Sequence, residues 1–322
     1  MTEFELIRRF FTRPAPGAVL GVGDDAALVR LRAGMDLAVS ADLLVEDRHF
    51  FAKADAALLG HKALAVNLSD MAAMGAKPRW ATLGLALPRA DARWLEGFAR
   101  GFFALARRHR VDLIGGDTTR GPLAIAVQIM GEVPRGKALR RDGARVGDDV
   151  WVSGRLGGAA LAVAAAKGEV RVPPRERRAL DQRLDAPTPR IALGIALRNV
   201  ARSAIDVSDG LLADLGHICE RSGVSAAIEW EALPASPCVR ALAQRTEVAV
   251  RAILAGGDDY ELCFTAPPRR RAAVVAAARR ARTEVMLIGR VTRRQRAAPL
   301  VTVLDSIGKP LKVRWRGYEH FR

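Results

Sequence analysis

The segment DVSDGLLADL, residues 206–215, joins a short apolar run to apolar residues at helical spacing. We therefore expect a strand that turns directly into a helix. A helix N-terminus offers unpaired N–H groups and a partial positive charge, so Ser208 or Asp209 is expected to cap the helix while the loop amides face a phosphate. Asp206 and Asp209 are near enough to share one metal cluster. Taken alone, the segment fits equally well an ordinary turn in which Asp209 is only a cap.

Similar aspartate-containing segments recur in both halves of the chain. They are GVGDDA at Asp24 and Asp25, SADLL at Asp42, NLSD at Asp70, GGDTT at Asp117, and GGDDYE at Asp258 and Asp259. The net charge is +16, so these acids do not belong to a generally acidic chain. Mg²⁺ takes oxygen ligands and is usually held by a few carboxylates together with substrate phosphates. The recurrence predicts a multi-metal site that handles a polyphosphate.

The composition is typical of a globular protein with two domains. The chain has 322 residues, of which 50% are hydrophobic and 27% charged, and this length is sufficient for two cores. Its 51 Lys and Arg against 35 Asp and Glu would attract anions. The same cations also suit a solvated surface, and no run interleaves them with aromatic residues as in single-strand binders. We expect no nucleic-acid partner.

Three widely spaced cysteines, Cys219, Cys238 and Cys263, form no CxxC pair. We therefore expect neither a zinc site nor disulfides, and infer a reduced, cytoplasmic protein. The N-terminal MTEFELIRRFF has acids in its first turn and no long apolar stretch, unlike a signal peptide. Ala159–Ala166 is about half a membrane span, so no membrane partner is expected.

Short strands and helices alternate along the chain, which is typical of an α/β or α+β protein. In the N-terminal half we expect short strands at 26–31 and 37–40, and GGDTT as a turn after a strand at 111–114. A break rich in Arg, Gly and Asp at 134–149 precedes a new strand, VWVSG. The chain is therefore expected to divide near residue 140.

Several well-known site patterns do not occur. The sequence has neither a GxxxxGK[ST] loop nor the HRD and DFG motifs of protein kinases, and its five histidines lack zincin spacing. Asn67 and Asp70 lie three residues apart on an expected helix and share a face. Because the surrounding stretch is apolar, Asp70 would need a partner there, either a metal or an arginine.

The order of these segments resembles bacterial thiamine-monophosphate kinase. The matching segments, which cover nearly the whole chain, are GVGDDAAL, SADLLVEDRHF, GHKALAVNLSDMAAMGAKPRW, GGDTT, RDGARVGDDVWVSG, DVSDGLLADL, GGDDYELCF and GYEHF. The GDD, GGD and DxSDG segments are shared with a superfamily that includes aminoimidazole-ribonucleotide synthetase and selenophosphate synthetase. DLLVEDRHF, GGDDYELCF and GYEHF point to this member.

The resemblance implies both a reaction and a fold. ATP would phosphorylate thiamine monophosphate by direct in-line transfer assisted by several Mg²⁺ ions, giving thiamine diphosphate and ADP, the final step of thiamine diphosphate biosynthesis. The need for a monovalent cation stays open. The implied fold is α/β (α+β) with two aminoimidazole-ribonucleotide synthetase-like domains. Residues 1–140 would bind ATP and Mg²⁺ and form a dimer barrel in a homodimer, and residues 141–322 would form a C-terminal α/β domain.

Site residues are carried over by motif position. The implied metal ligands are Asp25, Ser40, Asp42, Asp70, Asp117, Asp206 and Asp209. The implied ATP contacts are Gly116, Asp117, Arg141 and Ser208. The implied contacts to thiamine monophosphate are His49, Asp258 and Tyr318. Of these, the residues expected to be catalytic are Asp42, Asp209 and Arg141, whose guanidinium can pair with phosphate oxygens.

Three positions depart from the family pattern. Ala41 stands where the family often has Thr, Asp258 where it more often has Glu, and Ala99 where some members have an aromatic residue that contacts adenine. Two other functions remain as alternatives. One is another ATP-dependent member of the superfamily with a different acceptor, and the other is a basic nucleic-acid-binding protein, which would show salt-steep binding without Mg²⁺-dependent turnover.

Overall fold

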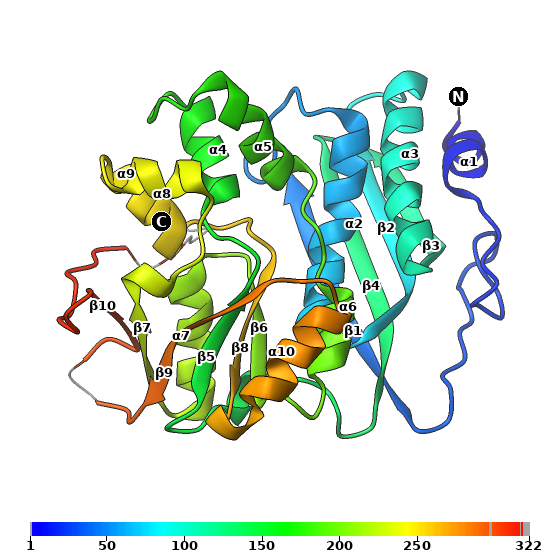
Figure 1. The fold of residues 1–322 in the computed structure, drawn as a ribbon. Coiled ribbons are helices and arrows are strands. Elements are labelled where there is room, and N and C mark those ends of the chain that lie inside the picture. Colours follow the sequence, from blue (N-terminus) through cyan, green and yellow to red (C-terminus); the bar gives the residue numbers. More distant parts are fainter. Residues whose placement is uncertain (1, 296–297, 316, 318–322) are drawn as a thin grey trace. The chain divides into compact units, whose positions relative to one another are not determined.

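The computed structural model describes residues 2–295, 298–315 and 317, and its fold is drawn in Figure 1. The chain forms two compact units. The N-terminal unit contains Met1–Met71 and Ala76–Gly136, and the C-terminal unit contains Ala72–Gly75 and Lys137–Arg322. The main boundary between the units therefore falls at the Arg- and Gly-rich break. The short stretch Ala72–Gly75, at the end of a helix, belongs with the C-terminal unit.

The N-terminal unit is built around a four-stranded sheet. Its elements are α1 (Glu3–Leu6), a π-helical turn (Ile7–Phe11), β1 (Met35–Val45), α2 (Ala56–Ala73), β2 (Lys77–Leu87), α3 (Ala92–His109), β3 (Asp112–Arg120) and β4 (Ala124–Pro134). The strand order is β1-β4-β2-β3. β4 pairs antiparallel with both β1 and β2, whereas β2 and β3 are parallel and are connected through α3. Parallel neighbours need such a crossover connection.

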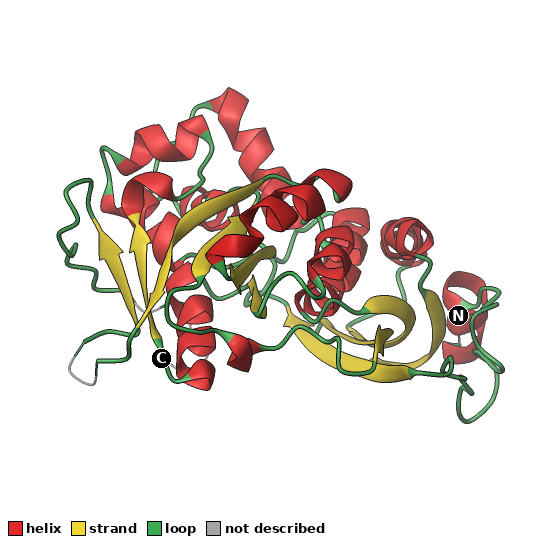
Figure 2. Ribbon diagram, turned by 60° about the horizontal axis from the view of Figure 1, so that its bottom comes forward, coloured by secondary structure: helices red, strands yellow, loops and turns green. Residues whose placement is uncertain are grey.

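Among the described residues of this unit, helices cover one face of the sheet, as Figure 2 shows. On that face Ile125, Val127 and Ile129 of β4 are buried. The alternate residues of β1 point to the opposite face, and Val39 and Leu43 are 51% and 56% exposed. Since side chains alternate along a strand, the sheet has one core face and one uncovered apolar face.

Two glycines allow α2 and α3 to pack closely. A Cβ at Gly60 would overlap the carbonyl oxygen of Phe98, and a Cβ at Gly101 would overlap that of Ala57. Large side chains on the same helices, among them Leu64 and Phe102, fill the space above the sheet. The close crossing brings the helix backbones over the core face of the sheet.

The C-terminal unit has a six-stranded sheet with the order β10-β7-β9-β5-β8-β6. Its strands are β5 (Asp149–Ser153), β6 (Ser203–Val207), β7 (Ser225–Glu229), β8 (Glu261–Ala266), β9 (Val285–Thr292) and β10 (Val301–Leu304). Its helices are α4 (Gly158–Ala166), α5 (Pro174–Asp185), α6 (Ile191–Leu197), α7 (Leu211–Ser222), α8 (Pro237–Ala243), α9 (Glu247–Ala255) and α10 (Arg271–Arg280). Short 3₁₀ turns lie at Arg141–Gly143, Trp230–Ala232 and Pro268–Arg270.

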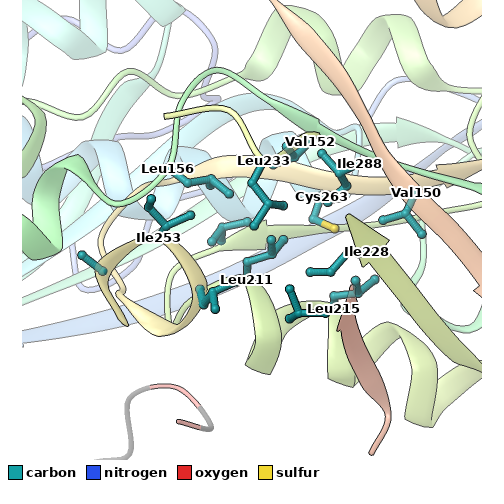
Figure 3. Packing of buried hydrophobic residues seen from close by; sticks show 14 of the residues in the cluster. Val150, Val152, Leu156, Leu211, Leu215, Ile228, Leu233, Ile253, Cys263 and Ile288 are labelled. Carbon is teal, nitrogen blue, oxygen red and sulfur yellow. The ribbon is translucent and has the colours of Figure 1, made fainter. Parts of the chain in front are cut away.

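The core of this unit combines sheet and helix side chains (Figure 3). Val150 and Val152 of β5 pack there with Leu211 and Leu215 of α7. Every residue of β5 and β8 is buried, as expected for central strands covered on both faces, and the edge strand β6 is also buried throughout. Cys263 lies in this core, and all three cysteines of the unit are free thiols.

The sequence pattern located most elements but not all. In place of short strands at 26–31 and 37–40, the structure has a single long strand, β1, and an isolated bridge at Leu28. The Pro- and Arg-rich stretch at 171–190 contains a helix, α5, that begins with proline at its first turn. Within the described residues no helix is both long and apolar enough to cross a membrane.

Candidate functional site

A pocket of about 640 Å³ lies within the N-terminal unit. It is lined by the GVGDDA loop, by the GGDT part of β3, by Thr82 and Leu83 of β2, and by the first turns of the chain. Asp25, Gly116 and Asp117 therefore line one cavity, although about 90 residues separate the two segments in sequence. Both carboxylates are exposed. This pocket brings together three of the expected site residues.

A β-bulge presents Gly116 and Asp117 to the pocket. The GGDTT segment was expected to be a turn, but it lies inside β3, where the pairing with β2 shifts register between Ala81 and Thr82. Gly116 has a φ of 148°, and a Cβ there would overlap the carbonyl oxygen of Leu83. Only glycine fits such a position. Asp117 Oδ1 accepts a 2.9 Å hydrogen bond from the Thr118 amide.

Apolar side chains also line this pocket. Phe4, Ile7 and Phe11 from the N-terminal turns contribute to it, next to Glu3. Thr2 and Glu5 form a reciprocal capping box that fixes the start of α1. Phe4 is 73% exposed. A cavity lined by both carboxylates and aromatic rings suits a ligand that joins a polyanion, through a cation, to a flat apolar group.

Ala99, the position at which some family members have an aromatic residue that contacts adenine, is 4% exposed within α3 and does not line this pocket. The exposed aromatic residue that lines the pocket is Phe4. Sequence reasoning missed it because the apolar side of a short N-terminal helix looks the same whether it faces a core or a ligand.

A second group of expected ligands lies between β1 and α2. The Ser40 hydroxyl donates a 2.5 Å hydrogen bond to Asp70 Oδ2. Asp42 follows Ser40 by two residues along β1 and therefore points to the same face of the sheet. Neither Asp42 nor Asp70 lies in a turn: the first is inside a strand and the second inside a helix. The structure brings these three residues together.

One buried side-chain oxygen beside this group, Oδ1 of Asn67, has no hydrogen-bond donor. Asn67 is fully buried one helical turn before Asp70, and its amide nitrogen donates to the Ala63 carbonyl at 3.1 Å. Its Oδ1 accepts no hydrogen bond. A buried polar oxygen without a donor is costly, whereas a cation or an ordered water would satisfy it. The oxygen-only donor set of Ser40, Asp42, Asp70 and Asn67 fits a hard cation such as Mg²⁺.

His49 follows β1 in the same unit. Its Nδ1 accepts a 3.0 Å hydrogen bond from the Val45 amide, and its carbonyl oxygen accepts one from Lys62 Nζ at 3.2 Å. With Nδ1 acting as an acceptor, a proton on the neutral ring sits on Nε2. His49 is half-buried.

The DVSDG segment of the C-terminal unit turns from β6 into α7, as expected. The capping differs from expectation, because Gly210 is the N-cap and no side chain caps the helix there. The amides of Ser208, Asp209 and Gly210 all donate to Asp214 Oδ2, each at 3.1 Å. These amides therefore face a carboxylate of the protein rather than an open phosphate site. Burial, with the nearby charges of Asp206 and Asp209, raises the pKa of Asp214 to about 8.

Asp258 lies beside this turn. Its amide donates to the Ser208 carbonyl at 2.8 Å, and the Tyr260 amide donates to Val207 at the same distance. Asp258 and Tyr260 both have positive φ, 67° and 49°, and the Tyr260 hydroxyl donates to Asp258 Oδ1 at 2.9 Å. Strained backbone of this kind persists only where the surroundings hold it. The structure thus groups Asp206, Ser208, Asp209 and Asp258.

A buried network that sequence reasoning missed lies under this segment. Glu261 is 1% exposed and accepts two hydrogen bonds from Arg190, at 2.6 and 2.5 Å, and one from the Ser153 hydroxyl at 2.6 Å. Both oxygens of Asp259 accept from the Gly157 amide, at 3.1 and 2.8 Å. Burial raises the pKa of Asp259 well above its usual range. No local sequence signal marks an Arg–Glu pair separated by 71 residues.

Arg141 lies apart from the DVSDG turn. Its carbonyl oxygen accepts a 2.8 Å hydrogen bond from Ser222, the last residue of α7. Asp209 precedes the first residue of that helix, whose 12 residues span about 18 Å at 1.5 Å per residue. Within the C-terminal unit, the structure does not bring Arg141 to Ser208 or Asp209. Tyr318 lies outside the described residues.

The expected metal ligands form two groups within the N-terminal unit and one within the C-terminal unit. Asp25 and Asp117 line the pocket, Ser40 meets Asp70, and Asp206 and Asp209 flank one turn. Among the residues the structure describes, no three acidic, histidine or cysteine side chains are placed so that they alone could hold a metal ion. Phosphate oxygens of a substrate would complete such incomplete sets.

Family comparisons match both units. Residues 23–133 match the model for AIR synthase related protein, N-terminal domain, and residues 145–301 match that for AIR synthase related protein, C-terminal domain. The thiamine-monophosphate kinase of Salmonella typhimurium is 43% identical over 323 residues, covering 99% of this chain and 98% of the relative.

Comparison with solved structures points to the same family as the sequence comparisons. The crystal structure of thiamine-monophosphate kinase from Stenotrophomonas maltophilia K279a has a TM-score of 0.83 and 48% identity over 93% of this chain and 94% of that one. AaThiL complexed with AMPPCP and TMP has a TM-score of 0.78 and 32% identity over 91% and 89%. The expected two-domain, aminoimidazole-ribonucleotide synthetase-like α/β fold is confirmed. With both halves matched in order and a relative of this identity along its whole length, the chain belongs to the thiamine-monophosphate kinase family.

Proposed function

We propose that this chain transfers the γ-phosphoryl group of ATP to thiamine monophosphate, giving thiamine diphosphate and ADP. Relatives at 43% and 48% identity are thiamine-monophosphate kinases, and a relative at 32% was solved with AMPPCP and TMP. These relatives favour this acceptor over the two alternative functions, a different acceptor or nucleic-acid binding.

The observation that carries the proposal is the pocket of the N-terminal unit. Asp25, Gly116 and Asp117 line this pocket together with Phe4 and Ile7, in a volume of about 640 Å³. A nucleoside triphosphate has the matching chemistry, with a polyphosphate at one end and a flat base at the other. We therefore assign ATP binding to this pocket, with Gly116 and Asp117 near the phosphates and Phe4 near the base.

The remaining assignments follow the groups described above. The Mg²⁺ ligands would be Asp25, Ser40, Asp42, Asp70 and Asp117 in the N-terminal unit, and Asp206 and Asp209 in the C-terminal unit. Bound Mg²⁺ would neutralise phosphate oxygens as charge moves in the transition state. The protein's own contribution is to orient two anions in line, because a phosphate is already an adequate nucleophile. Ser208 and Arg141 would contact ATP, with Asp42, Asp209 and Arg141 acting in catalysis, and His49, Asp258 and Tyr318 would contact thiamine monophosphate.

The test is a product assay with two acceptors. Purified protein is incubated with ATP, Mg²⁺ and either thiamine monophosphate or unphosphorylated thiamine, and thiamine diphosphate is measured by chromatography. Thiamine diphosphate formed from the monophosphate alone is the expected result. A folded protein that binds Mg²⁺ and ATP but forms no thiamine diphosphate would move the acceptor to another member of the superfamily.

A homodimer is part of the proposal. The uncovered sheet face carries Val39 and Leu43 on β1, both more than half exposed, and a second copy of the same face would bury them. Residues 1–140 would then form the ATP-binding and dimerisation domain, and residues 141–322 the C-terminal domain. A Val39→Glu/Leu43→Glu variant should sediment as a monomer while the unchanged protein sediments as a dimer. A monomeric unchanged protein would contradict this assignment.

Two further expectations belong to the same proposal. The three free thiols suit a reducing cytoplasm. A monovalent cation beside the phosphates is testable by comparing rates in potassium and in tetramethylammonium salts at equal ionic strength. Equal rates would remove the monovalent ion from the reaction.

A further inference from the structure

Asp214 makes an unusual set of contacts for a helix residue. It lies in the first turn of α7, is 2% exposed, and accepts hydrogen bonds from three successive amides, those of Ser208, Asp209 and Gly210. All three bonds end on the same oxygen, Oδ2, at 3.1 Å. Three convergent amides form the kind of concave site that elsewhere binds phosphate. In this chain a carboxylate of the protein occupies it.

The same turn is held from its other side. The carbonyl oxygens of Val207 and Ser208 accept hydrogen bonds at 2.8 Å from the amides of Tyr260 and Asp258. A Cβ at Gly210 would lie 2.6 to 2.9 Å from the backbone of Ala255. The backbone of the turn is therefore fixed through its amides, through its carbonyls and by packing.

This arrangement carries an electrostatic cost. Asp206 and Asp209 lie within eight residues of Asp214, and Asp206 and Asp214 are both buried. Buried carboxyl groups cost free energy unless hydrogen-bond donors compensate them. A serine or threonine side chain would cap a helix without this cost, as Ser236 does for α8. Asp214 instead binds the three amides that precede α7 and fixes their positions.

We propose that Asp214 is a positioning residue for phosphoryl transfer. It holds the backbone of residues 208–210 so that the side chains of Ser208 and Asp209 are presented to the Mg²⁺-bound phosphates. It also occupies the amides of the turn, so the phosphates meet side chains and metal there and not main-chain N–H groups. The inference rests on the proposed function for the metal and the phosphates, but not on which acceptor the enzyme uses.

The test compares Asp214→Ala and Asp214→Asn with Asp91→Ala. Asp91 is a matched control because its carboxylate caps α3 through the amides of Arg93 and Trp94, at 3.0 and 3.2 Å, and it is not part of the pocket. Binding of AMPPCP is measured by calorimetry across a range of Mg²⁺ concentrations. Steady-state kinetics then give kcat, the KM for each substrate and the Mg²⁺ concentration for half-maximal rate.

Asp214→Ala is expected to raise the half-maximal Mg²⁺ concentration and to weaken Mg²⁺-dependent AMPPCP binding, each by about 10- to 100-fold. kcat should fall, while the KM for thiamine monophosphate stays within about twofold. Asp214→Asn keeps an acceptor oxygen and should recover part of both losses. Asp91→Ala should lower the melting temperature without changing the Mg²⁺ dependence.

Folded Asp214 variants with unchanged Mg²⁺ dependence and unchanged AMPPCP binding would overturn the proposal. If Asp214→Ala does not fold, the near-isosteric Asp214→Asn decides alone by the same two measurements. If the unchanged protein binds Mg²⁺ and AMPPCP but forms no thiamine diphosphate, the proposed function fails. The binding comparison between variants still tests Asp214 in that case.

Discussion

Two acids from each unit are placed by different means. In the N-terminal unit Asp25 and Asp117 are exposed in the lining of a pocket, and a β-bulge between Leu113 and Gly115 shortly precedes Asp117. In the C-terminal unit Asp214 and Glu261 are at most 2% exposed and are held by donated hydrogen bonds. Exposed acids keep their charge in water, whereas buried ones need donors. Changes at Asp25 or Asp117 should therefore affect activity, and changes at Asp214 or Glu261 should affect stability as well.

The largest expected effect tests the buried network. Glu261→Gln leaves the Arg190 guanidinium without its buried charge partner, and breaking such a pair costs about 3–5 kcal/mol. Denaturant unfolding measures the change. The control is Asp181→Asn, which breaks a partly exposed pair with Arg177 one helical turn away, and pairs of this type contribute about 0.3–0.5 kcal/mol. Equal losses in the two variants would contradict the difference between buried and exposed acids.

The second prediction compares one acid from each unit. Asp117→Asn and Asp209→Asn should each lower kcat by about 100- to 1,000-fold, as expected when stabilisation of transition-state charge is lost. Their stabilities should differ. Asp117 is exposed, so its variant should keep the melting temperature. Asp209→Asn removes a charge that helps to raise the pKa of Asp214 to about 8, so above pH 8, where Asp214 is ionised, it should raise the melting temperature by about 2–4 °C. Differential scanning calorimetry with activity assays checks both. A lower melting temperature for Asp209→Asn would contradict the expected unfavourable effect of the Asp209 charge on the C-terminal unit.

Backbone geometry in the N-terminal unit is tested at Gly116. Gly116→Ala combines a positive φ with overlap on the Leu83 carbonyl, which should cost about 1–3 kcal/mol and reduce activity by displacing Asp117. Gly136→Ala is matched, since Gly136 also has a positive φ, 68°, but no atom lies within 4 Å of its added Cβ. It should lose stability only. Identical kinetics in the two variants would show that the bulge does not position Asp117.

The smallest expected effect concerns the apolar lining of the pocket. Phe4→Ala should raise the KM for ATP by about two- to tenfold and leave kcat unchanged, because base stacking is equal in ground and transition states. Leu58→Ala is the control, since Leu58 is also exposed, 40%, in the same unit but does not line the pocket. No change in the KM for ATP would remove Phe4 from the nucleotide site.

Much of the architecture could be predicted from local patterns. Apolar residues at helical spacing predicted α7, and the expected helix that carries Asn67 and Asp70 is α2. A resemblance carried largely by glycine–aspartate segments led to the correct family. The glycines in one of these segments, GGDTT, led to the wrong prediction of a turn. GGDTT lies inside a strand because its pairing with β2 tolerates a bulge, and that depends on a neighbour about 30 residues away in the sequence.

Individual site residues could be predicted from the sequence only where neighbouring site residues lie in the same short segment. Asp206 and Asp209 share a turn in sequence and in structure. Asp214 stands in the same segment, and an acid in the first turn of a helix that begins after glycine was a usable signal. Glu261 with Arg190, and Phe4 with Asp117, depend on tertiary packing between distant segments, for which no local pattern exists.

The free cysteines allow the opening of the C-terminal unit to be followed by thiol labelling. All of them lie in that unit, and Cys219 and Cys263 are buried in its core, where burial raises the pKa of both thiols, that of Cys219 to about 12. Alkylating reagents react with the thiolate, so these two should be labelled only when the unit opens. Labelling kinetics read by mass spectrometry would thus follow the opening of one half of the native enzyme, with no engineered probe, while nucleotide is added to the other.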